Sequence, residues 1–118
     1  MNTENKDLKP RTKEFALGII KMYCALPKTT VAQVLGKQVL RSGTSVGANY
    51  REANRARSKV EFISKMGDYL KELDETAYWL ELLVESGIVR QTTMAELLNE
   101  TDQLTAIFVT IINKAKNP

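Results

Sequence analysis

The sequence predicts an all-α protein, an up-down-up-down antiparallel four-helix bundle. Apolar residues recur at spacings of three and four along four separate segments, which is the period of an amphipathic helix. Capping residues, prolines or glycines divide these segments, and no segment shows the alternation typical of a strand. The 118 residues are enough for one domain with one hydrophobic core, so we expect a single domain over 1–118.

The first helix is expected at about residues 10–26. Pro10 is acceptable in a first helical turn, and Pro27 cannot continue a helix. Residues 1–8 are polar and are expected to form a frayed tail.

The second and third helices are expected at about residues 31–56 and 59–86. Thr30 and Ser58 each precede a Gln or Glu by three residues, which is the pattern of a capping box. Gly87 follows the third helix and is suited to ending it.

The third helix has a regular apolar seam whose members alternate at three and four residues, a spacing that requires antiparallel neighbours at shallow angles. The seam consists of Ile63, Met66, Leu70, Leu73, Ala77, Leu80 and Val84. The fourth helix is expected at about residues 94–115, after a capping box at Thr93.

The stretch from Gln38 to Ala53 contains residues that a helix normally avoids, and they form two adjacent lines. The polar line is Gln38, Ser42, Ser45, Asn49 and Glu52. The small apolar line is Val39, Gly43, Val46, Tyr50 and Ala53. The polar line could be a ligand groove, but we favour a structural role in which Gln38, Ser45 and Asn49 hydrogen-bond neighbouring helices and fix their register.

This stretch also resembles the signature of a known family, the bacterial four-helix bundle proteins called ribosomal-RNA intervening-sequence proteins. The residues that carry the resemblance, with the second glycine of the motif, are Gln38, Arg41, Ser42, Gly43, Ser45, Gly47, Asn49 and Glu52. The run from Lys71 to Leu83 is similar to the third helix of that family, so the resemblance extends over nearly the whole chain.

The resemblance implies an up-down bundle that assembles with itself, often as a homopentamer. It implies little about function, because most members have none assigned. One relative is the accessory variability protein of diversity-generating retroelements, a basic pentamer that works with a reverse transcriptase and nucleic acid. A partner enzyme such as a reverse transcriptase is therefore one expectation.

Composition argues against most catalytic and metal-dependent functions. The chain has no histidine, which excludes histidine-dependent triads and the metal sites that rely on histidine. The acidic residues of the third helix are better explained as a solvated face than as catalytic carboxylates. We therefore expect no enzyme activity, no catalytic residue, no cofactor and no metal site.

The cellular location is expected to be the cytoplasm. Cys24 is the single cysteine, so no intrachain disulfide can form, and this fits a reducing compartment. The longest apolar run ends at Lys21 and is too short to span a bilayer, so we expect no membrane association. The charged residues near the N-terminus leave no room for the apolar core of a signal peptide.

Trp79 and Leu82 lie nearly opposite the predicted seam of the third helix. A monomeric bundle normally places charged residues there, so an apolar pair one turn apart predicts a contact with another subunit. We expect these two residues to lie in the interface of a homo-oligomer.

Basic residues give the sequence its one functional lead. In the predicted bundle, the starts of the first and third helices meet the ends of the second and fourth, and we call this the basic end. It has ten basic and five acidic residues, a net charge of +5, whereas the rest of the chain has seven and nine, a net charge of −2. The candidate nucleic-acid-binding residues are Lys9, Arg11, Lys13, Arg51, Arg55, Arg57, Lys59, Lys114 and Lys116.

The leading hypothesis is a non-enzymatic accessory factor that binds RNA or DNA through phosphate contacts at the basic end. Cations at helix C-termini also complement the helix dipole, which explains Arg51, Arg55, Lys114 and Lys116. Positive charge is unfavourable at helix starts, where the sequence places Lys9, Arg11, Lys13 and Lys59. The alternative is a protein-protein scaffold or oligomeric structural protein with no role in nucleic-acid binding.

Overall fold

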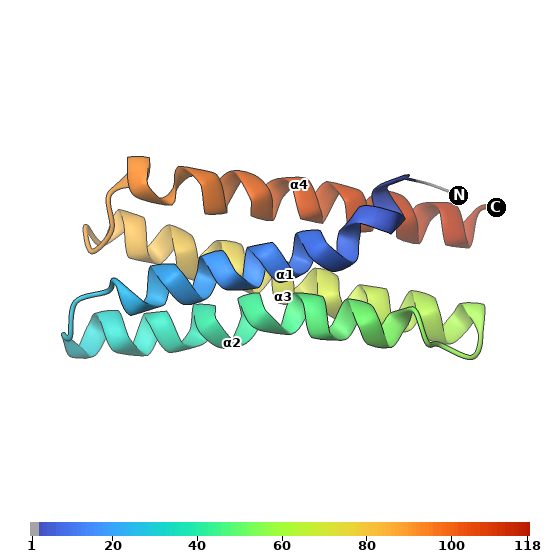
Figure 1. The fold of residues 1–118 in the computed structure, drawn as a ribbon, viewed down its shortest axis with the longest axis horizontal. Helices are drawn as coiled ribbons and strands as arrows, with labels where there is room; N and C mark the ends of the chain where they lie inside the picture. The colour runs from blue at the N-terminus through green and yellow to red at the C-terminus, as the bar shows by residue number, and fades with distance from the viewer. Residues whose placement is uncertain (1–2) are drawn as a thin grey trace.

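Four antiparallel helices account for the structure, a computed structural model that describes residues 3–118 and the side chains from Leu8 onward (Figure 1). The helices are α1 (Thr3–Cys24), α2 (Thr30–Ala53), α3 (Lys59–Glu85) and α4 (Gln91–Lys116). They form an elongated body of 47 × 22 × 21 Å. The predicted all-α, up-down-up-down bundle is therefore confirmed.

Helix α1 begins earlier than predicted. It starts at Thr3 rather than near Pro10, so the prediction of a tail over residues 1–8 is wrong from Thr3 onward, and residues 1–2 lie outside the described part. Pro10 lies inside the helix, where it removes one backbone hydrogen bond. Leu8 is completely buried in the core, and this packing holds the turn before the proline. Figure 1 shows the N-terminal part of α1 turning away from the line of the rest.

Side chains cap the starts of α2 and α3. Thr29 Oγ1 accepts a hydrogen bond of 3.3 Å from the Ala32 amide, one residue before the predicted cap. Ser58 Oγ accepts a hydrogen bond of 3.1 Å from the Glu61 amide, and the Glu61 carboxylate accepts one from the Arg57 amide. These bonds satisfy amides that have no partner within the helix.

Gly87 ends the third helix in the predicted manner. Its φ of +81° is the left-handed conformation that glycine adopts most readily, and the Ile88 amide bonds back to the Leu83 carbonyl at 3.1 Å. This tight reversal lets α4 begin at Gln91, three residues before the predicted start. Arg90, and not Thr93, is the N-terminal capping residue of α4, and it makes no side-chain cap.

The buried face of α3 differs from the predicted seam. Three seam residues are buried as expected, but Ile63, Leu70, Ala77 and Val84 are only half-buried. The buried residues of α3 are Met66, Tyr69, Leu73, Thr76, Leu80 and Leu83. Both sets have the same spacing, so periodicity alone could not decide which face is covered by α2 and α4.

The small apolar line of α2 is buried throughout, as predicted. Gly43 is required here because a Cβ atom at this position would lie 2.8 Å from Ile19 Cγ1 of α1. The glycine thus lets the two helices approach closely.

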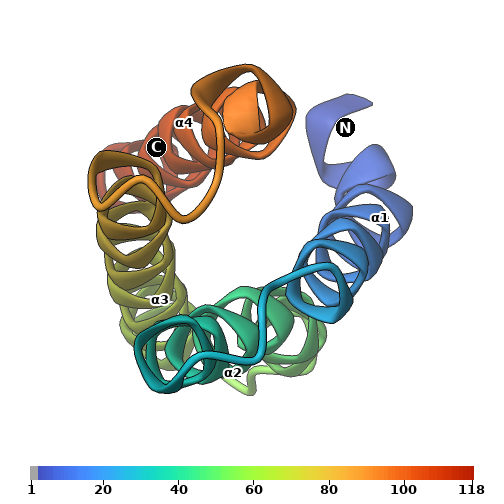
Figure 2. The same ribbon diagram turned by 90° about the vertical axis from the view of Figure 1, so that its left-hand side faces the viewer.

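Neighbouring helices in the sequence pack together, whereas α1 and α4 have the weakest contact. The view along the bundle shows α1, α2, α3 and α4 in this order, with α1 and α4 separated (Figure 2).

Candidate nucleic-acid interface

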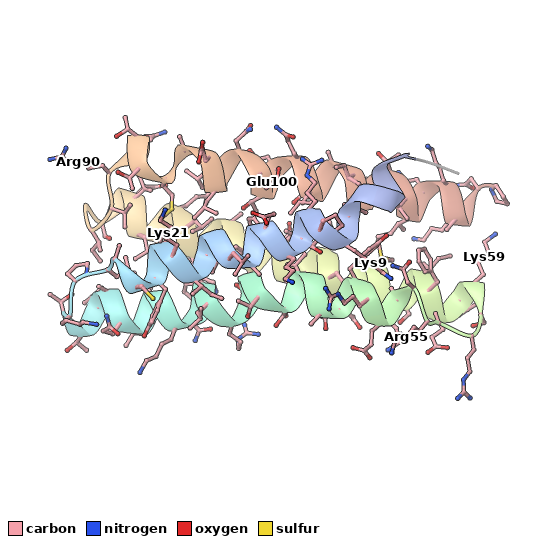
Figure 3. The ribbon with its side chains drawn as sticks, in the orientation of Figure 1. Lys9, Lys21, Arg55, Lys59, Arg90 and Glu100 are labelled. Atoms are coloured by element: carbon pink, nitrogen blue, oxygen red, sulfur yellow. The ribbon has the colours of Figure 1, made fainter. Side chains whose placement is uncertain are left out.

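The topology brings the predicted basic residues to one end of the molecule. The α2–α3 connection lies at the same end as the C-terminus of α4 and the early turns of α1 (Figure 1). Figure 3 shows Lys9, Arg55 and Lys59 at this end, far from Arg90 at the other. The sequence also assigns Lys6, Glu4 and Asp7 to this end, and their side chains lie outside the described part of the structure.

Five of the predicted residues lie on the connection and the neighbouring helix ends. Arg55, Arg57 and Lys59 are exposed around the α2–α3 connection, and Lys114 and Lys116 are exposed in the last turn of α4. The two α4 lysines complement the helix dipole, but Lys59 is the first residue of α3, where positive charge is unfavourable.

Three more predicted residues meet between α1 and α2. Lys9 and Lys13 of α1 and Arg51 of α2 are exposed and line a shallow groove of about 230 Å³. Because α1 begins at Thr3, both lysines belong to its interior and not to its first turn. Their positive charge therefore does not oppose the dipole of α1 in the way the sequence predicted.

Arg11 is committed to a different contact. Its guanidinium donates hydrogen bonds of 2.7 Å to both carboxylate oxygens of Glu100 on α4 and one of 2.8 Å to Gln103. This bidentate pair neutralises the arginine and ties α1 to α4. Arg11 therefore does not belong with the exposed cations of the basic end.

Three described acidic residues, Glu14, Glu52 and Glu61, belong to the basic end. Glu52 accepts a hydrogen bond of 3.0 Å from Lys65 on α3, and this bond with its attraction raises the pKa of Lys65. Glu61 accepts the Arg57 amide within the α3 cap. Glu14 lines a different groove, between α1 and α4. The eight exposed cations of this end outnumber its three described acidic residues, so its net charge stays positive.

Tyr69 is the titratable residue most changed by folding. It is 2% exposed on the core face of α3. Burial raises the pKa of the Tyr69 phenol to about 12, and the nearby charge of Glu52 acts in the same direction. Its role is packing, and the phenol stays protonated at neutral pH.

The residues of the predicted structural motif divide between the core and the surface. Ser42 is completely buried and shares a hydrogen bond of 2.8 Å with Thr76 of α3. Arg41 is exposed and bridges to Glu72 and Glu75 of α3 at 3.4 and 2.9 Å. Both residues join α2 to α3.

The other polar members of the motif contribute less to the contacts between helices. Ser45 donates a hydrogen bond of 2.7 Å to the Arg41 carbonyl of its own helix. Gln38 and Asn49 are half-buried, and within the described part of the chain their side chains form no hydrogen bond. The contact between helices that was expected of Gln38, Ser45 and Asn49 is made instead by Ser42.

The predicted interface residues Trp79 and Leu82 are half-buried within one chain. Because the buried face of α3 is rotated from the predicted seam, Trp79 packs against the core, and its Nε1 is buried with no hydrogen-bond partner among the described residues. The sequence placed Trp79 nearly opposite the core, and this prediction is wrong. The adjacent Tyr78 is 54% exposed, and its ring meets the Trp79 ring edge-on at 5.1 Å.

A second and larger groove lies between α1 and α4. It has a volume of about 730 Å³ and an apolar lining that includes Phe15, Met22 and Leu97. Charged residues such as Lys21 and Glu96 line its edges. The groove follows from the weak contact between α1 and α4.

Comparison with known proteins identifies the family. A family model described as 23S rRNA-intervening sequence protein matches residues 4–110. The chain belongs to this family. The chain is also similar to a protein of unknown function from the S23 ribosomal protein family of Bacteroides thetaiotaomicron VPI-5482, whose crystal structure is known. The two sequences are 38% identical, and the two structures superpose with a TM-score of 0.86. The match covers 92% of this chain and 97% of that one.

The resemblance inferred from the sequence motifs is thus confirmed for the 23S rRNA-intervening sequence protein family. No curated protein matches the chain. In the part of the present chain that the structure describes, no helix is long and apolar enough to cross a membrane. Among the described side chains, from Leu8 onward, no three Cys, Asp or Glu residues are grouped in a way that could hold a metal ion.

Sequence reasoning missed two features of the site. The first is Glu100, the partner of Arg11, because a pairing across 89 positions has no sequence signal. The second is the floor of the α1–α2 groove, which includes Ala16 and Ala48. The small size of Ala16 and Ala48 could have predicted the groove, because small side chains leave space between the cations of α1 and α2.

Proposed function

We propose that this protein is a non-enzymatic accessory factor that binds nucleic acid through phosphate contacts at its basic end. The observation that carries the proposal is the convergence of eight exposed cations from all four helices and the α2–α3 connection. These cations are Lys9, Lys13, Arg51, Arg55, Arg57, Lys59, Lys114 and Lys116. Of the three described acidic residues at this end, Glu52 is paired with Lys65 of α3.

Phosphate contact is favoured over base recognition by the composition of this surface. No exposed aromatic ring lies among Arg51, Arg55, Arg57 and Lys59, and the neighbouring Tyr50 is buried and stacks on Phe108. Stacking on aromatic rings is a common means of holding unpaired bases. Binding is therefore expected to depend on counterion release, with little preference for sequence and a steep dependence on salt.

Self-assembly is a further part of the proposal. A ring of subunits, such as a pentamer, multiplies the charge of each basic end and presents a longer positive surface to a polyanion. A partner enzyme such as a reverse transcriptase, which acts on the bound strand, is compatible with such a positioning role. A cytoplasmic location completes the proposal.

Fluorescence anisotropy at low salt with labelled RNA, single-stranded DNA and duplex DNA tests the proposal. Exchanging Arg55 and Arg57 together for Glu is expected to weaken binding to all three ligands, whereas exchanging the exposed Lys71 of α3 for Glu has a small effect. Lys65 is unsuitable as a control, because its removal frees the carboxylate of Glu52. If the unchanged protein binds none of the three ligands at low salt, the nucleic-acid role is wrong.

The second candidate function is a protein-protein scaffold, and the apolar α1–α4 groove favours it. An open groove of about 730 Å³ with an apolar lining is a feature that protein partners use. Failure to bind nucleic acid, together with a stable homo-oligomer, would support this candidate.

A further inference from the structure

The groove between α1 and α2 differs from the rest of the basic end because it has walls. Lys9 and Lys13 of α1 form one wall, Arg51 of α2 lies on the other, and the small residues Ala16, Gly47 and Ala48 line the space between them. The two lysines are one helical turn apart, so they lie on the same side of α1. Three cations from two helices therefore surround one small volume.

The groove is lined by no acidic side chain of the described residues. The two nearest acids in the sequence, Glu14 and Glu52, lie next to Lys13 and Arg51, but neither faces the groove. Glu14 lines the α1–α4 groove, and Glu52 is bound to Lys65 of α3. No ion pair within the described part of the chain involves Lys9, Lys13 or Arg51.

The neutral donors of the groove are already used. Thr12 Oγ1 donates to the Leu8 carbonyl at 2.7 Å, and Thr44 Oγ1 donates to the Leu40 carbonyl at 2.6 Å. Each hydroxyl has one proton to donate, so neither hydroxyl offers a proton to a ligand. The remaining donors are the ammonium groups of the two lysines and the guanidinium of Arg51, which together favour an anion.

Gly47 sets the distance between the two walls. A Cβ atom there would lie 3.1 Å from Thr12 Oγ1 and 3.3 Å from Thr12 Cβ, so α1 and α2 approach closely at this position. The close approach keeps Arg51 near the lysines of α1. The cations of the α2–α3 connection lack such walls, and holding a ligand there requires more ordering of side chains.

We propose that this α1–α2 groove holds one phosphodiester of the bound nucleic-acid backbone, a position that rests on the function proposed above. Arg51 can donate two hydrogen bonds to phosphate oxygens, and Lys9 and Lys13 add charge from the opposite wall. The other cations of the basic end contact the backbone beyond this position. The groove thus fixes where the strand crosses the molecule.

The test uses Ala48, an exposed residue that lines the groove. Ala48→Glu places a carboxylate among the three cations, and Ala48→Gln adds the same bulk without charge. In fluorescence anisotropy with a short labelled RNA, Ala48→Glu is expected to bind about tenfold more weakly than Ala48→Gln at about 50 mM salt. Ala95→Glu adds the same charge on an exposed part of α4 at the other end and is expected to have a much smaller effect.

The salt dependence tests the number of phosphates. If one phosphodiester is held by all three cations, changing Lys9, Lys13 and Arg51 together to Gln lowers the slope of log K against log salt by about 0.7 for a single strand. Three separate contacts would lower the slope by about 2.1, and this result would overturn the proposal of a single phosphate. Far-UV circular dichroism of each variant verifies that the helices are retained.

Inorganic phosphate serves as the probe for a general anion site. At matched ionic strength it is expected to displace RNA no better than chloride does. Stronger displacement by phosphate that disappears in Ala48→Glu would assign the groove to a free anion and overturn the nucleic-acid assignment.

The two proposals fail in different ways. If the unchanged protein binds no nucleic acid, the function and the groove both fail. If it binds, the Arg55 and Arg57 exchanges weaken binding, and Ala48→Glu equals Ala48→Gln, then only the groove assignment is overturned.

Discussion

Arg11 of α1 and Glu100 of α4 face each other in a bidentate ion pair with two hydrogen bonds of 2.7 Å. The pair lies on the side of the bundle where the two helices have the weakest contact. Both side chains are about one-third exposed or less, at 31% and 27%. Solvent screens this pair less than a pair on the open surface, and the bidentate geometry adds to its strength.

A double-mutant cycle measures this contact. Arg11→Met, Glu100→Gln and the double variant are expected to give a coupling free energy of about 1 kcal/mol in urea unfolding. The pair between Lys65 and Glu52 is the comparison, because Glu52 is 63% exposed. Its coupling is expected to be smaller than that of the Arg11–Glu100 pair, because solvent screens it more. Equal coupling in the two cycles would contradict the argument from burial and geometry.

Two glycines are expected to respond in opposite directions to the same substitution. Gly43→Ala brings a Cβ atom to 2.8 Å from Ile19 Cγ1 and is expected to destabilise the protein by about 1–3 kcal/mol. Gly67→Ala meets no atom within 4 Å and is expected to stabilise α3 by up to about 1 kcal/mol. Urea unfolding of the two variants measures both free-energy changes.

Ile19→Val provides the control for the close contact at Gly43. Combined with Gly43→Ala, it removes a methyl group from the crowded region and is expected to recover part of the lost stability. If Gly43→Ala alone raises the stability as much as Gly67→Ala does, the close approach of α1 and α2 is not limiting.

Tyr69 is expected to make the protein sensitive to alkali. Its pKa of about 12 in the folded state exceeds the ordinary value of about 10, so folding disfavours the phenolate. The contribution of the protonated phenol to stability is complete below pH of about 10 and is lost between about 10 and 12. Thermal melts across this range are expected to show a decrease in melting temperature. Tyr69→Phe, which cannot ionise, should show a smaller decrease, and an equal decrease would contradict this assignment.

The protein is expected to form a homo-oligomer through the outer side of α3. Light scattering after size exclusion should give a mass several times the 13.3 kDa of one chain. Trp79 packs against the core, so Leu82→Glu is the better variant for reducing the mass while the helices persist.

Leu17→Glu is the matched control for the oligomer experiment, since Leu17 is 49% exposed on α1. It is expected to leave the mass unchanged. A monomer of the unchanged protein at micromolar concentration would contradict the prediction, and a loss of mass only in Leu17→Glu would move the interface to α1.

The fold was predictable because several local signals agree with one another. Ser58 and Gly87 mark the start and the end of α3, and the buried small line of α2 is visible in the sequence. The start of α1 was missed because Pro10 is compatible with a first turn, whereas the tertiary packing of Leu8 extends the helix beyond it. Local rules cannot include such packing.

The candidate site was predictable as a region but not as an arrangement. Helix order alone brings Arg55, Lys59 and Lys114 to one end. Which cations remain available depends on side-chain pairs between helices, and the pairing of Arg11 with Glu100 has no counterpart in local sequence. The sequence also could not decide which face of α3 is buried, because two sets of residues have the same helical spacing. Packing against α2 and α4 decides it, and this places Trp79 against the core.

The order of helices around the bundle also has a kinetic consequence. Because each helix packs mainly on the helix that precedes or follows it, with five-residue connections between them, most native contacts join segments that are close in the chain. Such a topology has a low relative contact order, and proteins of this kind fold within microseconds to milliseconds. The α2–α3 hairpin, with the most extensive contact of the three, is the natural nucleus on which α1 and α4 can dock independently from either side.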